Sequence, residues 1–134
     1  MIKKIEHLGI AVKDIAESNV VFSQLLGREP YKSEKVEREG VITSFFQVGE
    51  SKIELLQATH PDSPIAKYLD KFKEGIHHIA LDVDDILEEM KRLQGLGFVL
   101  LSDVPKPGAD GKKIVFLHPK STNGVLVELC QDRD

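Results

Sequence analysis

Two histidines and two glutamates recur at matching places in the two halves of this chain, and together they could bind a metal ion. His7 opens the segment HLGIAV, and His78 opens the similar segment HIALDV 71 residues later. Glu54 follows His7 by 47 residues, and Glu128 follows His78 by 50. Two imidazoles and two carboxylates suit a borderline or hard divalent cation such as Co, Ni, Mn, Zn or Fe. The repeat therefore predicts one metal site with four ligands.

Each of these four residues also has a purely structural interpretation. A histidine near the end of a strand is more often a hydrogen-bonded structural residue, and a glutamate within a strand usually faces water. Glu54 and Glu128, however, interrupt runs that are otherwise apolar. An unpaired carboxylate is costly to bury, and a shared cation would compensate both charges. The single Cys130 excludes a thiolate-based structural zinc site and is expected to be a small buried residue rather than a nucleophile.

Length and charge limit the classes of protein to which the chain can belong. Its 134 residues are enough for one substantial core and too few for two large ones. A net charge of −4 and a pI near 5.7 provide no basic field for a nucleic acid. No apolar run approaches the length that spans a membrane, and no apolar signal region precedes the first strand. We therefore expect a cytoplasmic protein with neither a nucleic acid nor a membrane as partner.

The elements that must position the four residues form two modules of the same order. In the first, about residues 1–58, a strand over 3–12 precedes a helix that Asp14 caps and Gly27 stops. An edge strand over 29–36 and strands over 41–48 and 51–57 complete a β-α-β-β-β order. Proline-bounded residues then introduce a connector helix within about 62–73.

The second module, about residues 75–134, repeats this order. We predict a strand over 78–83, a helix over 85–96 with Ile86, Met90 and Leu93 on one face, and a short strand over 98–101. A Pro/Gly loop over 105–111 leads to strands over 113–117 and 125–130. The pattern predicts a single α+β domain over 1–134 in which the two βαβββ modules share a sheet.

Several segments resemble a known family. The chain is similar to the vicinal oxygen chelate (glyoxalase/bleomycin resistance) superfamily, and within it most closely to the methylmalonyl-CoA epimerase family. The His and Glu positions mark the superfamily, and the match to the epimerases rests on IEHLGIAV (5–12), DSPIA (62–66), GIHHIA (75–80), GK (111–112), FLHPK (116–120) and GVLVEL (124–129). The resemblance implies two modules in a cupped mixed sheet around the metal with the helices outside, a homodimer, and interconversion of (R)- and (S)-methylmalonyl-CoA.

The resemblance also implies roles for the predicted ligands, which are His7, Glu54, His78 and Glu128. A divalent ion, with Co²⁺ favoured and Ni²⁺, Mn²⁺ or Zn²⁺ possible, would stabilise the enolate formed when the α-proton of the thioester is removed. Glu128 matches a glutamate that is both ligand and acid/base in the family. For the opposite face we expect Glu54, which replaces a glutamine of some members, because Thr43 stands where some members have glutamate. Lys52 shares the strand face of Glu54.

Two other functions are compatible with the same fold. A glyoxalase I would use a similar four-ligand site to isomerise a glutathione hemithioacetal, and a non-enzymatic binding protein would sequester a small molecule. The complete set of four candidate ligands favours an enzyme over the binding protein. No phosphate-binding glycine motif identifies the coenzyme A contacts. The remaining histidines are expected to have structural or turn roles, although His118 and Lys120 could also approach the substrate; they are His60, His77 and His118.

Overall fold

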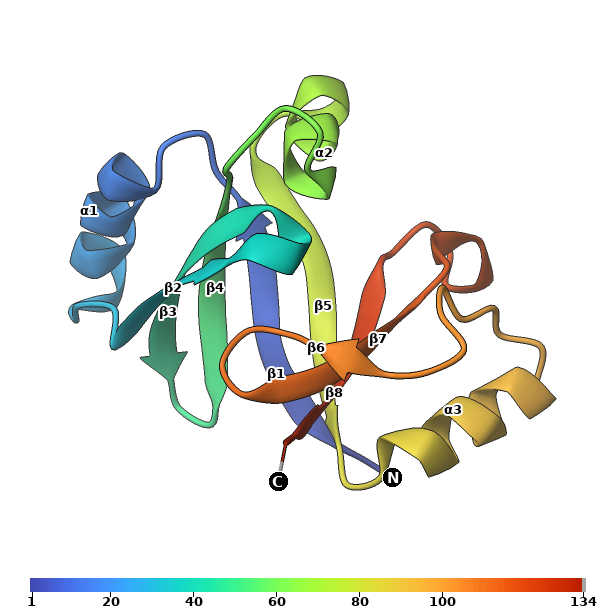
Figure 1. The fold of residues 1–134 in the computed structure, drawn as a ribbon. Helices are drawn as coiled ribbons and strands as arrows, with labels where there is room; N and C mark the ends of the chain where they lie inside the picture. The colour runs from blue at the N-terminus through green and yellow to red at the C-terminus, as the bar shows by residue number, and fades with distance from the viewer. Residues whose placement is uncertain (134) are drawn as a thin grey trace. The chain divides into compact units, whose positions relative to one another are not determined.

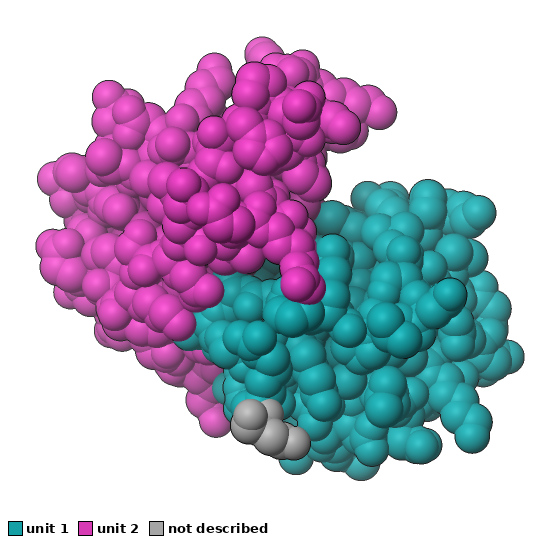
Figure 2. Space-filling model, in the orientation of Figure 1, with its two compact units in different colours: residues 1–7, 78–134 teal, residues 8–77 magenta. Residues whose placement is uncertain are grey.

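The computed structural model describes residues 1–133, which form two compact units (Figure 2). Unit 2 comprises residues 8–77, and unit 1 combines residues 1–7 with the chain from His78 onward. The boundaries fall immediately after His7 and immediately before His78. Strands β1 (Ile2–Ala11) and β5 (Gly75–Val83) therefore each contribute residues to both units.

Unit 2 contains a meander of antiparallel strands and two helices (Figure 1). Its strands follow the order β2-β3-β4-β1, so β2 is the edge strand that its polar, alternating sequence predicts. Strand β3 has the bounds predicted from its β-branched and aromatic residues. The elements are α1 (Ile15–Leu26), β2 (Lys32–Val36), the 3₁₀ turn η1 (Glu37–Glu39), β3 (Val41–Val48), β4 (Ser51–Ala58) and α2 (Pro64–Phe72).

Unit 1 contains a mixed sheet and one helix, in the strand order β1-β5-β8-β7-β6. Strand β8 is parallel to β5 and antiparallel to β7. The predicted α+β class with mixed strand directions is confirmed. The elements after β5 are α3 (Ile86–Gly95), β6 (Lys106–Pro107), β7 (Lys112–Leu117), the 3₁₀ turn η2 (Pro119–Ser121) and β8 (Val127–Asp132). No helix among residues 1–133 is long and apolar enough to cross a bilayer.

Each unit has apolar clusters that pack against its helices. In unit 1 the predicted face of α3, formed by Ile86, Met90 and Leu93, packs with Leu129 of β8 and with neighbouring residues of β7. In unit 2 the face of α1 packs against a cluster that contains Phe46 of β3. The helical periodicity in the sequence therefore predicted which side of α3 is buried.

One predicted strand of the second half is wrong. Residues 98–101 form only an isolated bridge between Leu100 and Leu117, and the strand that pairs beside β7 is β6, within the predicted Pro/Gly loop. Phe98 and Leu100 pack onto the unit 1 core, but Gly97, with a φ of 97°, and the turn after Leu101 leave little extended chain between them. The antiparallel partner of β7 is instead supplied after that turn by Lys106 and Pro107.

The N-termini of α1 and α3 are held by the same pair of interactions. Asp14 and Asp85 are the N-caps, and each accepts a hydrogen bond of 3.1 Å from the backbone N–H three residues later. In addition, Gln57 at the end of β4 accepts from the backbone N–H of Ile15 at 2.7 Å, and Gln131 of β8 accepts from that of Ile86 at 2.8 Å. Each glutamine lies three residues after the candidate glutamate of its strand, so the repeat includes a tie between helix and strand.

We expect Gln57→Ala and Gln131→Ala each to lower the free energy of unfolding by about 1 kcal/mol. Each change removes the acceptor of a partly buried backbone N–H at a helix terminus. Urea unfolding followed by circular dichroism would measure the change. Gln94→Ala, at an exposed position of α3, is the control and should stay within about 0.5 kcal/mol of the wild type; equal losses in all three variants would contradict the assigned tie.

Candidate metal centre

His7 and His78, the two histidines of the repeat, lie side by side in unit 1. They belong to β1 and β5, and both are buried, with exposed fractions of 6% and 5%. Their Nε2 atoms are 3.1 Å apart, and their rings meet edge to face with centroids 5.2 Å apart. The repeat predicted that His78 rather than His77 corresponds to His7, and the structure brings this pair together.

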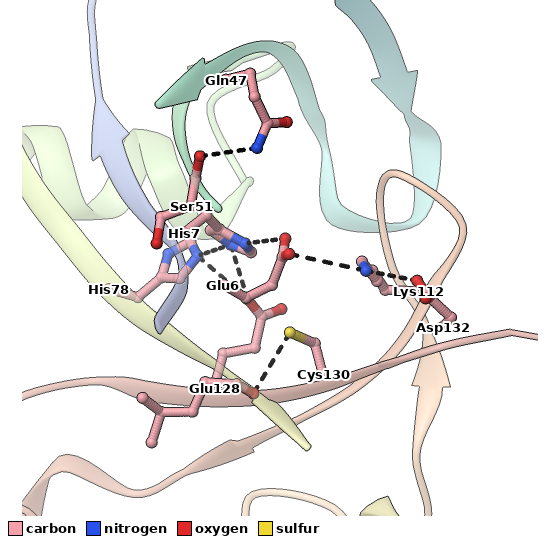
Figure 3. Close-up of polar contacts among 10 residues, drawn as sticks. Glu6, His7, Gln47, Ser51, His78, Lys112, Glu128, Cys130 and Asp132 are labelled. Atoms are coloured by element: carbon pink, nitrogen blue, oxygen red, sulfur yellow. Dashed lines mark hydrogen bonds and ion pairs between the residues drawn. The ribbon is translucent and has the colours of Figure 1, made fainter. Parts of the chain in front are cut away.

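Glu128 is the third predicted residue that the fold of unit 1 brings to the same place (Figure 3). In the parallel pairing of β5 with β8, Glu128 is opposite Ala80, and His78 lies on the same face as Ala80 because it is two residues away. The Oε1 atom of Glu128 lies 3.1 Å from Nε2 of His7 and 3.3 Å from Nε2 of His78. Strand register therefore places one carboxylate against both imidazoles.

The donor set of this cluster fits a divalent cation. Oε1 of Glu128 is fully buried and accepts no hydrogen bond of acceptable geometry from the described residues, although two ring nitrogens are near it. A buried carboxylate oxygen without such a bond is costly, and a cation among these three atoms would offset the cost. Two imidazole nitrogens and one carboxylate oxygen are ligands suited to Zn, Co, Ni, Mn or Fe. The chemistry of these three donors therefore fits a divalent metal ion.

The carboxyl group of Glu128 is held in its ionised form. Burial by itself would raise its pKa, but the imidazoles of His7 and His78 outweigh this effect and lower the pKa to about 2. Since the group is 5% exposed, its charge is poorly screened by water. Glu128 is therefore ionised at neutral pH, as a metal-binding carboxylate must be.

Glu54, the fourth predicted ligand, lies in β4 of unit 2, where it pairs with Phe45 of β3. Its position in an apolar run predicted that it would be buried, and its exposed fraction is 4%. Its role as a ligand stays a prediction. Thr43 in β3 is fully buried, and its hydroxyl donates to the backbone carbonyl of Glu34 at 3.3 Å, which agrees with a structural rather than an acid/base role.

The other residues considered from the sequence have structural contacts. The ring of His77 packs edge-on against Tyr68 in unit 2, with centroids 4.9 Å apart. Nδ1 of His118 accepts from the backbone N–H of Lys120 at 3.0 Å and so caps η2. Cys130 is fully buried, and burial raises the pKa of its thiol, which opposes nucleophilic chemistry.

Glu6, which the sequence did not single out, contacts the far side of His7. Oε1 of Glu6 lies 3.2 Å from Nδ1 of His7, and Glu6 is 2% exposed. Strand alternation directs neighbouring side chains to opposite faces, so it does not predict this contact. The one signal in the sequence was a charged residue directly beside a candidate ligand.

Known proteins are similar to this chain over nearly its whole length. The family described as the Glyoxalase/Bleomycin resistance protein/Dioxygenase superfamily matches residues 6–116. An ethylmalonyl-CoA/methylmalonyl-CoA epimerase of Cereibacter sphaeroides is 43% identical over 133 residues, which cover 98% of this chain and 99% of that protein.

Solved structures are similar in fold as well as in sequence. A methylmalonyl-CoA epimerase of Streptomyces coelicolor in complex with 2-nitronate-propionyl-CoA has a TM-score of 0.95 and 33% identity, over 98% of this chain and 96% of that chain. A methylmalonyl-CoA epimerase in complex with methylmalonyl-CoA and NH₄⁺ gives the same TM-score, identity and coverage.

The low pKa of Glu128 predicts how the metal-free protein loses stability in acid. A carboxyl group whose pKa is lower in the folded state stabilises the fold above its unfolded pKa, and this contribution is lost as the pH falls through the folded pKa. From the ordinary value of 4.5 to about 2, the loss is on the order of 3 kcal/mol. Urea unfolding at several pH values across this window would measure it.

The matched variant is Glu128→Gln, which keeps the shape of the side chain but cannot titrate. Its stability should decline less steeply than that of the wild type across the same pH window. Parallel declines in the two proteins would show that the Glu128 carboxyl is not held ionised.

Proposed function

The chain belongs to the Glyoxalase/Bleomycin resistance protein/Dioxygenase superfamily, and we propose that within it this protein interconverts the (R) and (S) forms of methylmalonyl-CoA. The observation that carries the proposal is the ionised Glu128 between His7 and His78, in a chain 43% identical to an ethylmalonyl-CoA/methylmalonyl-CoA epimerase. The resemblance to the epimerase family noted from the sequence is confirmed. The proposed substrate class, an acyl-CoA, is supported by the neighbouring structure that contains methylmalonyl-CoA.

Epimerisation needs a proton to leave one face of the α-carbon and a proton to arrive at the other. The C–H electron pair moves toward the thioester carbonyl as the proton is taken, and it returns to the carbon when a proton is delivered to the opposite face. Glu128 is the proposed acid/base on one face, because its carboxyl is ionised and buried. When bound, a divalent cation would act as a Lewis acid toward the oxygens of the substrate.

Glu54 is the proposed second acid/base and the proposed fourth ligand. Glu54 is buried and has a carboxyl group. Thr43 cannot transfer protons in its place, because its hydroxyl donates to the backbone carbonyl of Glu34. In this proposal the cation is bound by His7, His78, Glu54 and Glu128. Imidazole and carboxylate suit several borderline metals, and the family resemblance favours Co²⁺ among them. A cytoplasmic homodimer remains part of the proposal on the strength of the family resemblance.

The proposed reaction predicts metal-dependent exchange of the substrate α-proton. With the protein and Co²⁺ in D₂O, the proton NMR signal of the methylmalonyl-CoA α-proton should disappear much faster than without protein. Removal of the metal with a chelator should abolish the acceleration, and Co²⁺, Ni²⁺, Mn²⁺ or Zn²⁺ should restore it to different extents.

Two results would contradict this proposal in different ways. Absence of exchange with every metal, despite metal binding, together with conversion of the methylglyoxal–glutathione hemithioacetal, would assign glyoxalase chemistry instead. Failure to bind any divalent metal would favour a non-enzymatic small-molecule-binding protein.

Replacement of each proposed acid/base should separate the two faces of the reaction. We expect Glu128→Gln to lower the exchange rate of the epimer whose α-proton Glu128 removes by about 10²–10⁴-fold, the usual contribution of a positioned acid/base group. Glu54→Gln should retain exchange from one epimer while losing interconversion. Starting from each pure epimer in D₂O and following deuterium uptake by NMR would measure both effects.

Glu88→Gln is the control, since Glu88 is exposed on α3, and it should exchange both epimers like the wild type. A Glu128→Gln protein with full activity would remove Glu128 from the acid/base role. Unchanged exchange at both faces in Glu54→Gln would remove Glu54.

A further inference from the structure

His7 and His78 are equivalent in the repeat, but different groups surround the two rings. Nδ1 of His7 lies 3.2 Å from Oε1 of Glu6. The position before His78 is occupied by His77, and the ring of His78 packs edge-on against Phe116, with centroids 5.7 Å apart. The residue before His7 therefore has a carboxyl group, whereas the residue before His78 has an imidazole.

Glu6 is the inner end of a chain of charged groups within unit 1 (Figure 3). Its Oε2 lies 3.8 Å from Nζ of Lys112, which is also buried, and Nζ of Lys112 lies 2.5 Å from Oδ1 of Asp132. The Asp132 side chain is mostly exposed. A buried carboxylate is costly unless it is paired and hydrogen-bonded, and the Lys112 ammonium and the His7 ring both offset that cost at the position of Glu6.

The contact with Glu6 favours one of the two tautomers of His7. A carboxylate oxygen accepts hydrogen bonds, so Oε1 of Glu6 can accept from an Nδ1–H of His7. A neutral ring that donates from Nδ1 has its lone pair on Nε2, which is the form that can bind a metal through Nε2. Nε2 is the atom that lies 3.1 Å from both Nε2 of His78 and Oε1 of Glu128, so its lone pair is available within the candidate metal cluster.

We propose that Glu6 is a positioning residue that fixes the tautomer and orientation of His7 for metal binding, and that Lys112, with Asp132, holds the Glu6 carboxylate in place. This inference rests on the metal site of the proposed function. Metal-binding histidines generally donate their other ring N–H to a carboxylate, a backbone carbonyl or water, and loss of that partner weakens metal binding.

The tautomer can be measured in the metal-free protein, independently of activity. Nitrogen-15 NMR of the histidine rings at about pH 8, above the ordinary pKa of histidine near 6.5, distinguishes Nδ1–H from Nε2–H. We expect His7 of the wild type to carry its proton on Nδ1, and Glu6→Leu to shift His7 toward the Nε2–H form. A wild-type His7 protonated on Nε2 would overturn the proposal without any variant.

Metal affinity supplies the second readout. Competition with a chromogenic chelator for Co²⁺ should show Kd raised by about 10–100-fold in Glu6→Leu. Glu6→Gln retains a carbonyl oxygen that can accept from Nδ1, so its Kd should lie closer to that of the wild type. Glu89→Gln is the matched control, because Glu89 is another buried, ion-paired glutamate of unit 1, bonded to Arg92 at 2.6 Å, and its Kd should not change.

The outcomes separate this inference from the proposed function. A wild type that binds Co²⁺ while Glu6→Leu binds it equally well, with His7 in the same tautomer, overturns the role of Glu6 and leaves the metal site intact. A wild type that binds no divalent ion overturns both proposals. Equal thermal destabilisation of Glu6→Leu and Glu89→Gln, with metal affinity lost only in Glu6→Leu, would support a positioning role over a merely structural one.

Discussion

The burial of an ionised carboxylate between two imidazoles is the interaction on which the rest of this structure depends. Glu128 is 5% exposed, and the neighbouring His7 and His78 lower its pKa against the effect of burial. Its position follows from the parallel pairing of β5 with β8, which sets Glu128 opposite Ala80 and beside His78. The apolar cluster under α3 includes Leu129, the next residue of β8. The packing that stabilises unit 1 therefore also fixes the charge at its centre.

Much of the fold could be predicted because the signals were local. Asp14 and Asp85 are the N-caps of α1 and α3, and Gly27 ends α1. The β-branched run from Val41 to Val48 forms a strand with those bounds. The strand predicted over 98–101 is wrong because Gly97 and the turn after Leu101 leave little extended chain there, and Lys106 and Pro107 pair with β7 instead. The two glutamine ties were not predicted for a different reason: a glutamine near the end of a strand gives no local indication that it caps a helix more than 40 residues away.

The candidate site also contains residues that the sequence indicated and one residue that it did not. The repeat in the sequence pointed to His7, Glu54, His78 and Glu128. Three of them, His7, His78 and Glu128, lie together in unit 1, and the role of Glu54 stays a prediction. Glu6 was not predicted, because alternation along a strand places adjacent side chains on opposite faces, whereas both Glu6 and His7 are buried and in contact. Contacts between sequence neighbours in a strand depend on side-chain torsions, and periodicity carries no information about those.

The different residues before the two histidines bear on the history of the chain. The aspartate caps, the glutamine ties and the histidines occur in both halves, as expected if an ancestral gene for one half was duplicated. An ancestor that assembled from two identical half-length chains would necessarily have had the same residue before each histidine. With both halves in one chain, each position is encoded separately, so Glu6 and His77 can differ while the caps and the glutamine ties are present in both halves.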